Sequence, residues 1–213
     1  MAPGTWNRSP LHAILDIDAA ARAGWEPLDL ARALLDGGAP LIQLRAKQLA
    51  SGPFLDLCDR VVGLARTHGA SVVVNDRADL ARLSGAAGVH VGQDDLAPQD
   101  ARNLLGPDAI VGLSTHTLAQ VRLAAEEPVT YVAVGPVFGT TTKATGYDPV
   151  GLTLVSDAAR LIHPRPVVAI GGITLDTAAQ VVAAGASAVA VIGDLLTGGD
   201  PAGRVRAYLA ALQ

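Results

Sequence analysis

The sequence predicts a single (β/α)8 barrel, and three observations support that prediction. The chain has 213 residues, about the size of one compact domain. Half of its residues are hydrophobic and only 3% are aromatic, so the core is expected to be aliphatic, with alanine-rich helices packed on valine-rich strands. Short aliphatic runs alternate with helix-length segments in about eight units of roughly 25 residues, which is the period of such a barrel.

Eight short aliphatic or β-branched runs are expected to form the strands. Each is close to continuously hydrophobic, which is typical of parallel strands that are covered on both faces. In chain order they span residues 11–17, 41–44, 72–74, 89–91, 110–113, 131–134, 167–170 and 188–192.

Longer segments between these runs are expected to form the helices. Asp36-Gly-Gly and Ala184-Gly-Ala place glycine where a helix ends before the next strand. Thr174 and Asp176 supply capping side chains for the helix that begins there. The expected helices span residues 28–35, 54–67, 80–83, 98–105, 118–126, 151–162, 174–184 and 201–212.

The chain is expected to form one domain, because no Pro/Ser/Gly-rich linker and no change of composition divides it. Residues 11–213 would form the barrel, and residues 1–10 an N-terminal extension without an assigned role. The competing fold is an open, doubly wound sheet, which needs a glycine-rich turn after its first strand to bind a dinucleotide. Ile17 is followed instead by Asp-Ala-Ala-Ala, so the barrel is favoured.

Charge, hydrophobicity and cysteine content narrow the function classes. The net charge is −4 without an evident basic face, which argues against nucleic acid as a partner. No run of about 18 apolar residues predicts a membrane-spanning helix, and residues 1–9 do not resemble a secretion signal. Cys58 lies in a helical pattern and is interpreted as a buried structural thiol. As the single cysteine it forms no internal disulfide, which fits a reducing cytoplasm.

Polar residues recur where the expected strands end, which in a barrel is the mouth that carries catalytic groups. Any one of them alone would be ordinary surface or a helix cap, but their recurrence at nearly every strand end indicates a functional site. They are Gln43, Arg45 and Lys47 after the second strand, Asn75, Asp76 and Arg77 after the third, His90, Gln93, Asp94 and Asp95 after the fourth, Ser114, Thr115 and His116 after the fifth, Thr140, Thr141, Thr142 and Lys143 after the sixth, Gly171 and Gly172 after the seventh, and Ile192, Gly193 and Asp194 at the eighth.

The charged members of this set complement one another. Arg45, Lys47 and Lys143 are cations on different strands of one mouth, and phosphate or pyrophosphate is their natural counter-charge. Asp76 and Asp95 follow neighbouring strands and could hold Mg²⁺, which takes one or two carboxylates and completes its shell with water and substrate phosphate.

Other interpretations of the two carboxylates remain open. Asp76 and Asp95 could form salt bridges with Arg45 or Arg77, and Asp76 could cap the helix that contains Leu80. From the residues alone, metal binding and structural pairing are equally supported.

A second anion site is expected on the far side of the mouth. Gly171-Gly172 and Ile192-Gly193 follow the seventh and eighth strands, where barrels of this kind bind phosphate through backbone N–H groups. The alternative is that these glycines only form tight turns. Their joint occurrence in both loops favours the phosphate site.

With these residues assembled, the chain resembles the thiamine phosphate synthase family from Leu11 to about Tyr208. Six motifs in the same order carry the resemblance, although one such as Ile-Gly-Gly-Ile alone would be weak. They are Gln43-Leu-Arg-Ala-Lys47, Asn75-Asp-Arg-Ala-Asp79, Gly88-Val-His-Val-Gly-Gln-Asp-Asp95, Gly112-Leu-Ser-Thr-His-Thr117, Gly135-Pro-Val-Phe-Gly-Thr-Thr-Thr-Lys143 and Ala169-Ile-Gly-Gly-Ile173.

The resemblance implies a transferase that joins an aminopyrimidine pyrophosphate to a thiazole phosphate, with Mg²⁺ as cofactor. It implies that Asp76 and Asp95 ligate the metal, and that Arg45, Lys47, Lys143 and Ser114 are catalytic. The implied pyrimidine pyrophosphate contacts are Gln43, Leu44, Arg45, Ala46, Lys47, Asn75, Ser114 and Lys143, and the implied thiazole phosphate contacts are Thr140, Thr141, Thr142, Gly172, Ile192 and Gly193.

Two positions depart from the family pattern. Gly139 stands where proline is common, and Gly193 stands where serine is common. A backbone N–H donor survives the second change, but a hydroxyl contact does not. Neither change removes a charge that the implied chemistry needs.

Two alternative functions remain at this point. A thiazole tautomerase on the same barrel would use His116 to move a proton, but would not need Asp76, Asp95, Lys143 or Gln43. A catalytically silent phosphate sensor would keep the phosphate loops without paired carboxylates beside cations. The sequence leaves the oligomeric state open, a homo-oligomer included.

Overall fold

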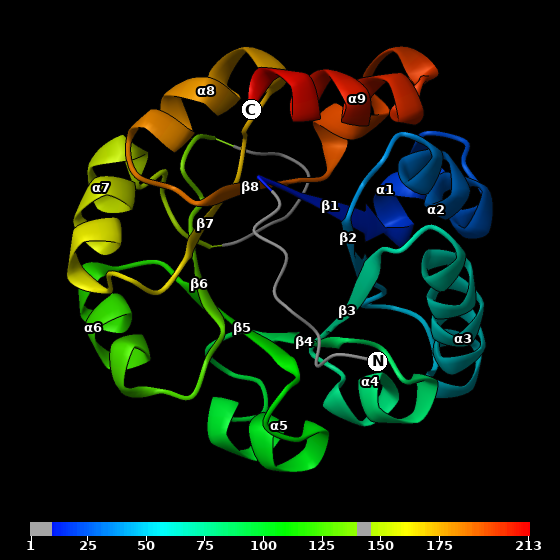
Figure 1. Cartoon of the computed structure of the whole chain (residues 1–213), viewed down its shortest axis with the longest axis horizontal. Helices are drawn as coiled ribbons and strands as arrows, with labels where there is room; N and C mark the ends of the chain where they lie inside the picture. The colour runs from blue at the N-terminus through cyan, green and yellow to red at the C-terminus, as the bar shows by residue number, and fades with distance from the viewer. Residues whose placement is uncertain (1–9, 140–145) are drawn as a thin grey trace.

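A computed structural model describes residues 10–139 and 146–213 of the chain. Within these residues, eight parallel strands close into a barrel in chain order, with β8 paired to β1. The helices form a ring around the strands (Figure 1). The predicted (β/α)8 fold is therefore confirmed. None of the helices in the described ranges is long and apolar enough to cross a membrane.

The strands agree with the predicted runs to within a residue or two at each end. Arg45 and Thr115 are the last residues of their strands, whereas Ile17 and Ile192 lie just beyond theirs. The strands are β1 (Leu11–Asp16), β2 (Leu41–Arg45), β3 (Ser71–Asn75), β4 (Gly88–Val91), β5 (Ile110–Thr115), β6 (Tyr131–Val134), β7 (Val167–Ile170) and β8 (Ala188–Val191).

The sequence did not predict two of the described helical segments, α1 and the 3₁₀ segment η1. Ile17, expected to end the first strand, begins α1, because the Asp16 carboxylate accepts a hydrogen bond from the Ala19 N–H and so caps a helix there. The helical segments are α1 (Ile17–Arg22), α2 (Pro27–Asp36), α3 (Ser51–Thr67), α4 (Ala78–Ser84), α5 (Pro98–Leu105), α6 (Leu118–Glu126), α7 (Gly151–Leu161), α8 (Leu175–Ala183), η1 (Gly193–Gly199) and α9 (Pro201–Ala211).

Helix ends show which of the expected caps form. Thr174 is the N-cap of α8, as expected, and exchanges hydrogen bonds with Thr177, whereas Asp176 lies in the first turn of the helix. Arg77, not Asp76, occupies the N-cap position of α4. The Asp76 side chain is therefore available for another role.

Alternate strand residues face opposite ways, as the twofold period of a strand requires. One set, which includes Leu15, Leu44 and Val74, packs in the layer between strands and helices, together with the fully buried Cys58. The smaller set fills the barrel interior and includes Ile14, Val73 and the large side chain of Tyr131. The interior is thus a packed core whose top forms the floor of the mouth.

Candidate active site

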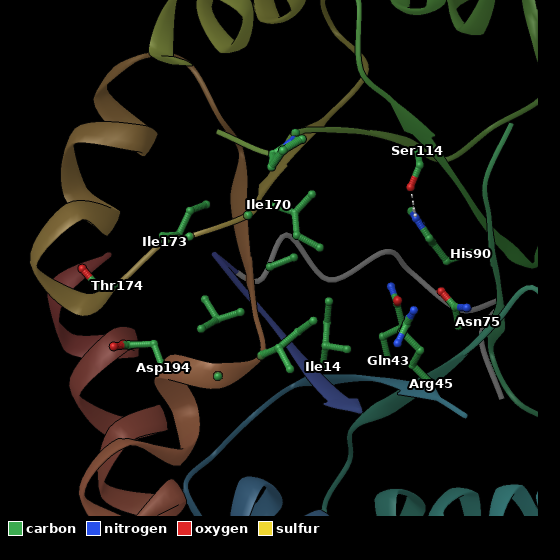
Figure 2. Close-up of a pocket in the computed structure, with 18 of the residues that line it drawn as sticks. Ile14, Gln43, Arg45, Asn75, His90, Ser114, Ile170, Ile173, Thr174 and Asp194 are labelled. Atoms are coloured by element: carbon green, nitrogen blue, oxygen red, sulfur yellow. Dashed lines mark hydrogen bonds between the residues drawn. The ribbon is translucent and has the colours of Figure 1, made fainter. Parts of the chain in front are cut away.

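A cavity of about 320 Å³ opens at the carboxyl ends of the strands, and its two opposite sides differ in chemistry. One side consists of polar side chains from β2 to β5, and the other of backbone-rich loops after β7 and β8 (Figure 2). Ile14, Ile170 and Ala190 lie between them and are apolar. We call the first side the polar wall, formed by Gln43, Arg45, Asn75, His90 and Ser114, and the second the glycine wall, formed by Gly171, Gly172, Ile192 and Gly193.

A chain of hydrogen bonds runs along the polar wall. His90 Nε2 lies 2.8 Å from Ser114 Oγ, and His90 Nδ1 lies 2.9 Å from the Tyr131 hydroxyl. Burial raises the pKa of Tyr131 against an opposing hydrogen bond from Gln43, so the phenol stays protonated. With Gln43 donating to the phenol oxygen, the phenol donates to Nδ1 and Nε2–H donates to Ser114. In that arrangement Ser114 Oγ accepts from His90, which leaves the Ser114 hydroxyl proton to be donated elsewhere.

This chain contains Tyr131, which the sequence analysis did not name as a site residue, and His90, which it named only among the strand-end residues. A Cβ on Gly112 would lie 2.4 Å from the Tyr131 hydroxyl and 2.5 Å from His90 Nδ1. Gly112 in β5 therefore makes room for their hydrogen bond. A glycine within an otherwise aliphatic strand was the signal that something bulky approaches there.

Arg45 is held at the end of β2 by a buried carboxylate. Asp16 at the end of β1 pairs with Arg45 Nη1 through one oxygen and accepts the Ala19 N–H at 2.8 Å through the other. The Asp16 side chain is 3% exposed and that of Arg45 13%. Arg45 Nε is buried and has no hydrogen-bond partner among the described residues. A bound anion would satisfy this donor.

Lys47, Asp76 and Asp95 form a charged cluster beside the polar wall. Asp76 follows Asn75 of that wall directly in the chain. Lys47 Nζ pairs with the Asp76 carboxylate, and the Asp76 and Asp95 carboxyl groups are in hydrogen-bonding contact. The Asp76 backbone has a positive φ of 65° and its N–H donates to the His90 carbonyl at 2.7 Å. Such a backbone is unusual outside glycine and is often found at functional sites.

The two carboxyls of this cluster differ in their electrostatic environment. Burial is the largest cause that raises the pKa of Asp76, with Asp95 adding to it and Lys47 opposing it. Burial also acts to raise the pKa of Asp95, but hydrogen bonds from Asp76 and from the Gly92 N–H at 2.8 Å outweigh it and the pKa is lowered. Two carboxylates in contact repel each other, and a cation bound between or beside them offsets that repulsion.

The structure does not show the alternative in which Asp76 and Asp95 form salt bridges with Arg45 or Arg77. Arg45 pairs with Asp16, and Arg77 pairs with Asp79 at 2.5 Å. In the described residues no group of three or more acidic, histidine or cysteine side chains gathers at one point. Two carboxylates nevertheless fit Mg²⁺, whose remaining ligands are normally water and substrate phosphate.

The glycine wall brings main chain to the cavity at its glycine positions. Gly171 and Gly172 have φ of +101° and +63°. A Cβ on Gly171 would lie 2.5 Å from Pro136 Cα, and one on Gly172 would lie 2.4 Å from the Gly139 carbonyl oxygen. These glycines do form tight turns, and the same geometry exposes backbone at the cavity, so the turns do not decide against an anion site.

Other predicted site residues have different positions. Thr140, Thr141, Thr142 and Lys143 lie outside the described residues. Leu44 is fully buried in the layer between strands and helices, so its side chain does not line the cavity. The Ala46 side chain packs against the same layer. Only the backbone of these two could contact a ligand in the mouth.

His116 lines the cavity, but the side chain that contacts Ser114 Oγ is His90. His116 Nδ1 lies 2.6 Å from the Gly135 carbonyl, which makes Nδ1 the protonated nitrogen. Its ring stacks on Tyr147 with centroids 3.8 Å apart. These contacts hold the imidazole on the side of β6.

The chain is similar to known proteins both in sequence and in overall structure. A family model described as thiamine monophosphate synthase matches residues 12–195. A thiamine-phosphate synthase of Anaeromyxobacter dehalogenans is 48% identical over 178 residues, 84% of this chain and 79% of that protein. One of Roseiflexus castenholzii is 41% identical over 200 residues, 94% of this chain and 86% of that protein. The solved thiamine phosphate pyrophosphorylase of Pyrococcus furiosus superposes with a TM-score of 0.86 at 28% identity, covering 97% of this chain and 96% of that one.

Proposed function

The chain belongs to the thiamine monophosphate synthase family, and from that membership we propose that it condenses an aminopyrimidine carried on a pyrophosphate ester with a thiazole carried on a phosphate ester. The products are thiamine phosphate and pyrophosphate. The observation that carries the proposal is the two-sided cavity, with a polar wall facing a glycine wall across one mouth. A substrate pair with an anion at each end fits such a site.

The polar wall is proposed to hold the pyrimidine pyrophosphate. The amides of Gln43 and Asn75 and the Ser114 hydroxyl supply directional hydrogen-bonding groups. An aminopyrimidine ring can both donate to and accept from such groups, and its ester oxygens can accept from them. The guanidinium of Arg45, with one arm fixed by Asp16, presents its remaining N–H groups to the pyrophosphate. Lys47 and Lys143 would add two further positive charges.

Asp76 and Asp95 are proposed to hold Mg²⁺. Their carboxyl groups are in contact, and Lys47 supplies the positive charge beside Asp76. When bound, the metal would supply positive charge that favours departure of pyrophosphate. Lys47 would then be released toward the same leaving group.

The reaction requires the carbon–oxygen bond to pyrophosphate to break and a carbon–nitrogen bond to the thiazole nitrogen to form. The exocyclic carbon is attached to an electron-rich aminopyrimidine, so the bond to pyrophosphate can break first. The electron pair leaves with pyrophosphate, where Arg45, Lys47 and Lys143 stabilise the growing charge. No protein nucleophile or general base is needed.

The glycine wall is proposed to bind the thiazole phosphate through backbone N–H groups at Gly172, Ile192 and Gly193, with Thr140, Thr141 and Thr142 as side-chain donors. Because the two anions would be bound on opposite sides of one cavity, the thiazole nitrogen is held close to the reacting carbon. That placement replaces a bimolecular encounter in solution.

One incubation tests this proposal directly. Purified protein, Mg²⁺ and both phosphorylated halves should yield thiamine phosphate and pyrophosphate in equal amounts, and omission of either half should yield neither. EDTA should stop the reaction and excess Mg²⁺ restore it, while full activity in EDTA would rule out the metal site. Isomerisation of the thiazole phosphate without any condensation would show a tautomerase instead.

A further inference from the structure

The Asp194 carboxylate lies at the edge of the glycine wall and joins three segments of the chain. It accepts the Leu175 N–H at 3.1 Å, Arg204 Nε at 3.1 Å and the Tyr208 hydroxyl at 2.5 Å. A further bond from Arg204 Nη2 reaches its second oxygen at 2.9 Å. Figure 2 shows Asp194 on the same side of the cavity as Thr174, the N-cap of α8.

These contacts connect the two loops of the glycine wall. Leu175 comes three residues after Gly172, and Asp194 follows Gly193 directly. The Tyr208 hydroxyl also lies 3.5 Å from the Ile173 carbonyl. The Asp194 carboxylate, which belongs to the segment after β8, therefore bonds to the start of α8, which follows the loop after β7. Arg204 and Tyr208 of α9 hold the same carboxylate.

A negative charge here would ordinarily oppose phosphate binding. Arg204 neutralises it by a two-point contact with both oxygens, and the Asp194 side chain is only 12% exposed. Burial raises the pKa of Tyr208, and its contact with Asp194 raises it further, so the phenol remains an O–H donor. Oδ2 of the carboxylate thus accepts from Leu175, Arg204 and Tyr208, and Oδ1 accepts from Arg204, so most of its hydrogen-bonding capacity is used by the protein.

We infer that Asp194 is a positioning residue that sets the distance between the two backbone segments proposed to bind the thiazole phosphate. The inference rests on the proposed function. Position 193 is glycine and has no side chain that could hold this loop, whereas the carboxylate of the next residue, Asp194, makes the bonds described above. The carboxylate need not touch the ligand, because it acts through Gly172 and Gly193.

The test compares KM for each of the two substrates in Asp194→Asn and in wild-type protein. Removal of a charge-assisted clamp from buried surroundings should raise KM for the thiazole phosphate roughly 10-fold or more, while KM for the pyrimidine pyrophosphate changes less than about twofold. Tyr208→Phe, which removes one donor and keeps the ion pair, should show the same selectivity with a smaller rise. A role in folding alone would move both KM values together or neither.

Asp176→Asn is the matched control, because Asp176 is an exposed acid in the first turn of α8 and should leave both KM values unchanged. If Asp194→Asn does not fold, Tyr208→Phe decides the question.

Calorimetric titration of the same proteins with thiazole phosphate gives a readout that does not need turnover. Equal thiazole phosphate affinity in wild type and both variants, or tighter binding by Asp194→Asn through the released Arg204, would overturn the inference. Wild-type protein that binds the thiazole phosphate but never condenses it would overturn the proposed function alone.

Discussion

The polar wall and the glycine wall differ in the groups that they present, although both lie at the same mouth. The polar wall presents side chains, and each is fixed by a neighbour, as Asp16 fixes Arg45 and His90 fixes Ser114. The glycine wall presents backbone, and its geometry depends on close approach at Gly171 and Gly172 and on the Asp194 clamp. The difference implies that the polar wall is sensitive to charge, and the glycine wall to shape.

Loss of charge from the polar wall should have the largest effect on catalysis. Arg45→Gln should lower kcat by about 10²–10³, since removal of one electrostatic contact with developing charge typically costs that much. Lys143→Ala should behave similarly. Arg45→Lys should retain part of the activity, because it keeps the charge but loses the planar fork.

The control for this prediction is Arg77→Gln. Arg77 pairs with Asp79 and Ser51 and does not line the cavity, so kcat should be unchanged. A loss at Arg45→Gln that appears only as a raised KM would instead assign Arg45 to ground-state binding.

A change of shape in the glycine wall should affect stability and thiazole phosphate binding together. Gly172→Ala puts a Cβ 2.4 Å from the Gly139 carbonyl on a backbone with φ of +63°. The strain should lower the free energy of unfolding by about 1–3 kcal/mol and raise KM for the thiazole phosphate more than KM for the other substrate. Chemical denaturation and steady-state kinetics measure the two effects.

Gly198→Ala separates strain from contact in that prediction. Gly198 has a similar φ of +79°, but an added Cβ meets nothing within 4 Å. Gly198→Ala should therefore lower the free energy of unfolding without a selective rise in KM for the thiazole phosphate. Identical behaviour of the two variants would mean that close approach to Gly139 does not matter.

Beneath the polar wall, His12 should make the fold acid-sensitive. Burial lowers the pKa of His12 to about 3, with the charge of His90 as a smaller cause. Below its unfolded pKa of about 6.5 the unfolded chain binds a proton that the folded protein does not, so stability is lost as pH falls from about 6.5 toward 3. From pH 7 to pH 5 this one group should cost about 2 kcal/mol.

Denaturation curves at several pH values for His12→Gln would measure this contribution as the difference from wild type. His68→Gln is the contrasting control, because the Leu64 carbonyl and Asp36 raise the pKa of the exposed His68, so its contribution has the opposite sign. A His12→Gln protein with the same acid sensitivity as wild type would show that His12 does not control it.

The smallest effect is expected at His116. In a synthase the imidazole has no proton to transfer, and its contacts include the Gly135 carbonyl and the Tyr147 ring. His116→Gln keeps a hydrogen-bonding arm and should retain condensation within about 10-fold of wild type. A loss of about 10²–10⁴ would instead indicate general acid–base catalysis by this residue.

Much of the polar wall could be predicted because its residues follow directly from strand ends. Gln43, Asn75 and Ser114 line the cavity as expected, since parallel strands bring their carboxyl ends to one mouth. The partners that orient them were harder to predict. Tyr131 on β6 contacts His90 from 41 residues away, and Asp16 on β1 contacts Arg45 from 29 residues away, so neither pair follows from a local pattern.

By itself the sequence determined the period of strands and helices, the aliphatic core and the strand-end residues, because these depend on local pattern. The tertiary structure decided which oppositely charged groups pair, as Lys47 with Asp76 and Arg45 with Asp16, because several partners were equally near in sequence. It also decided the role of Asp194, which accepts donors from α8 and α9 at once. Such a contact exists only after the last helix packs against the barrel, so no local pattern encodes it.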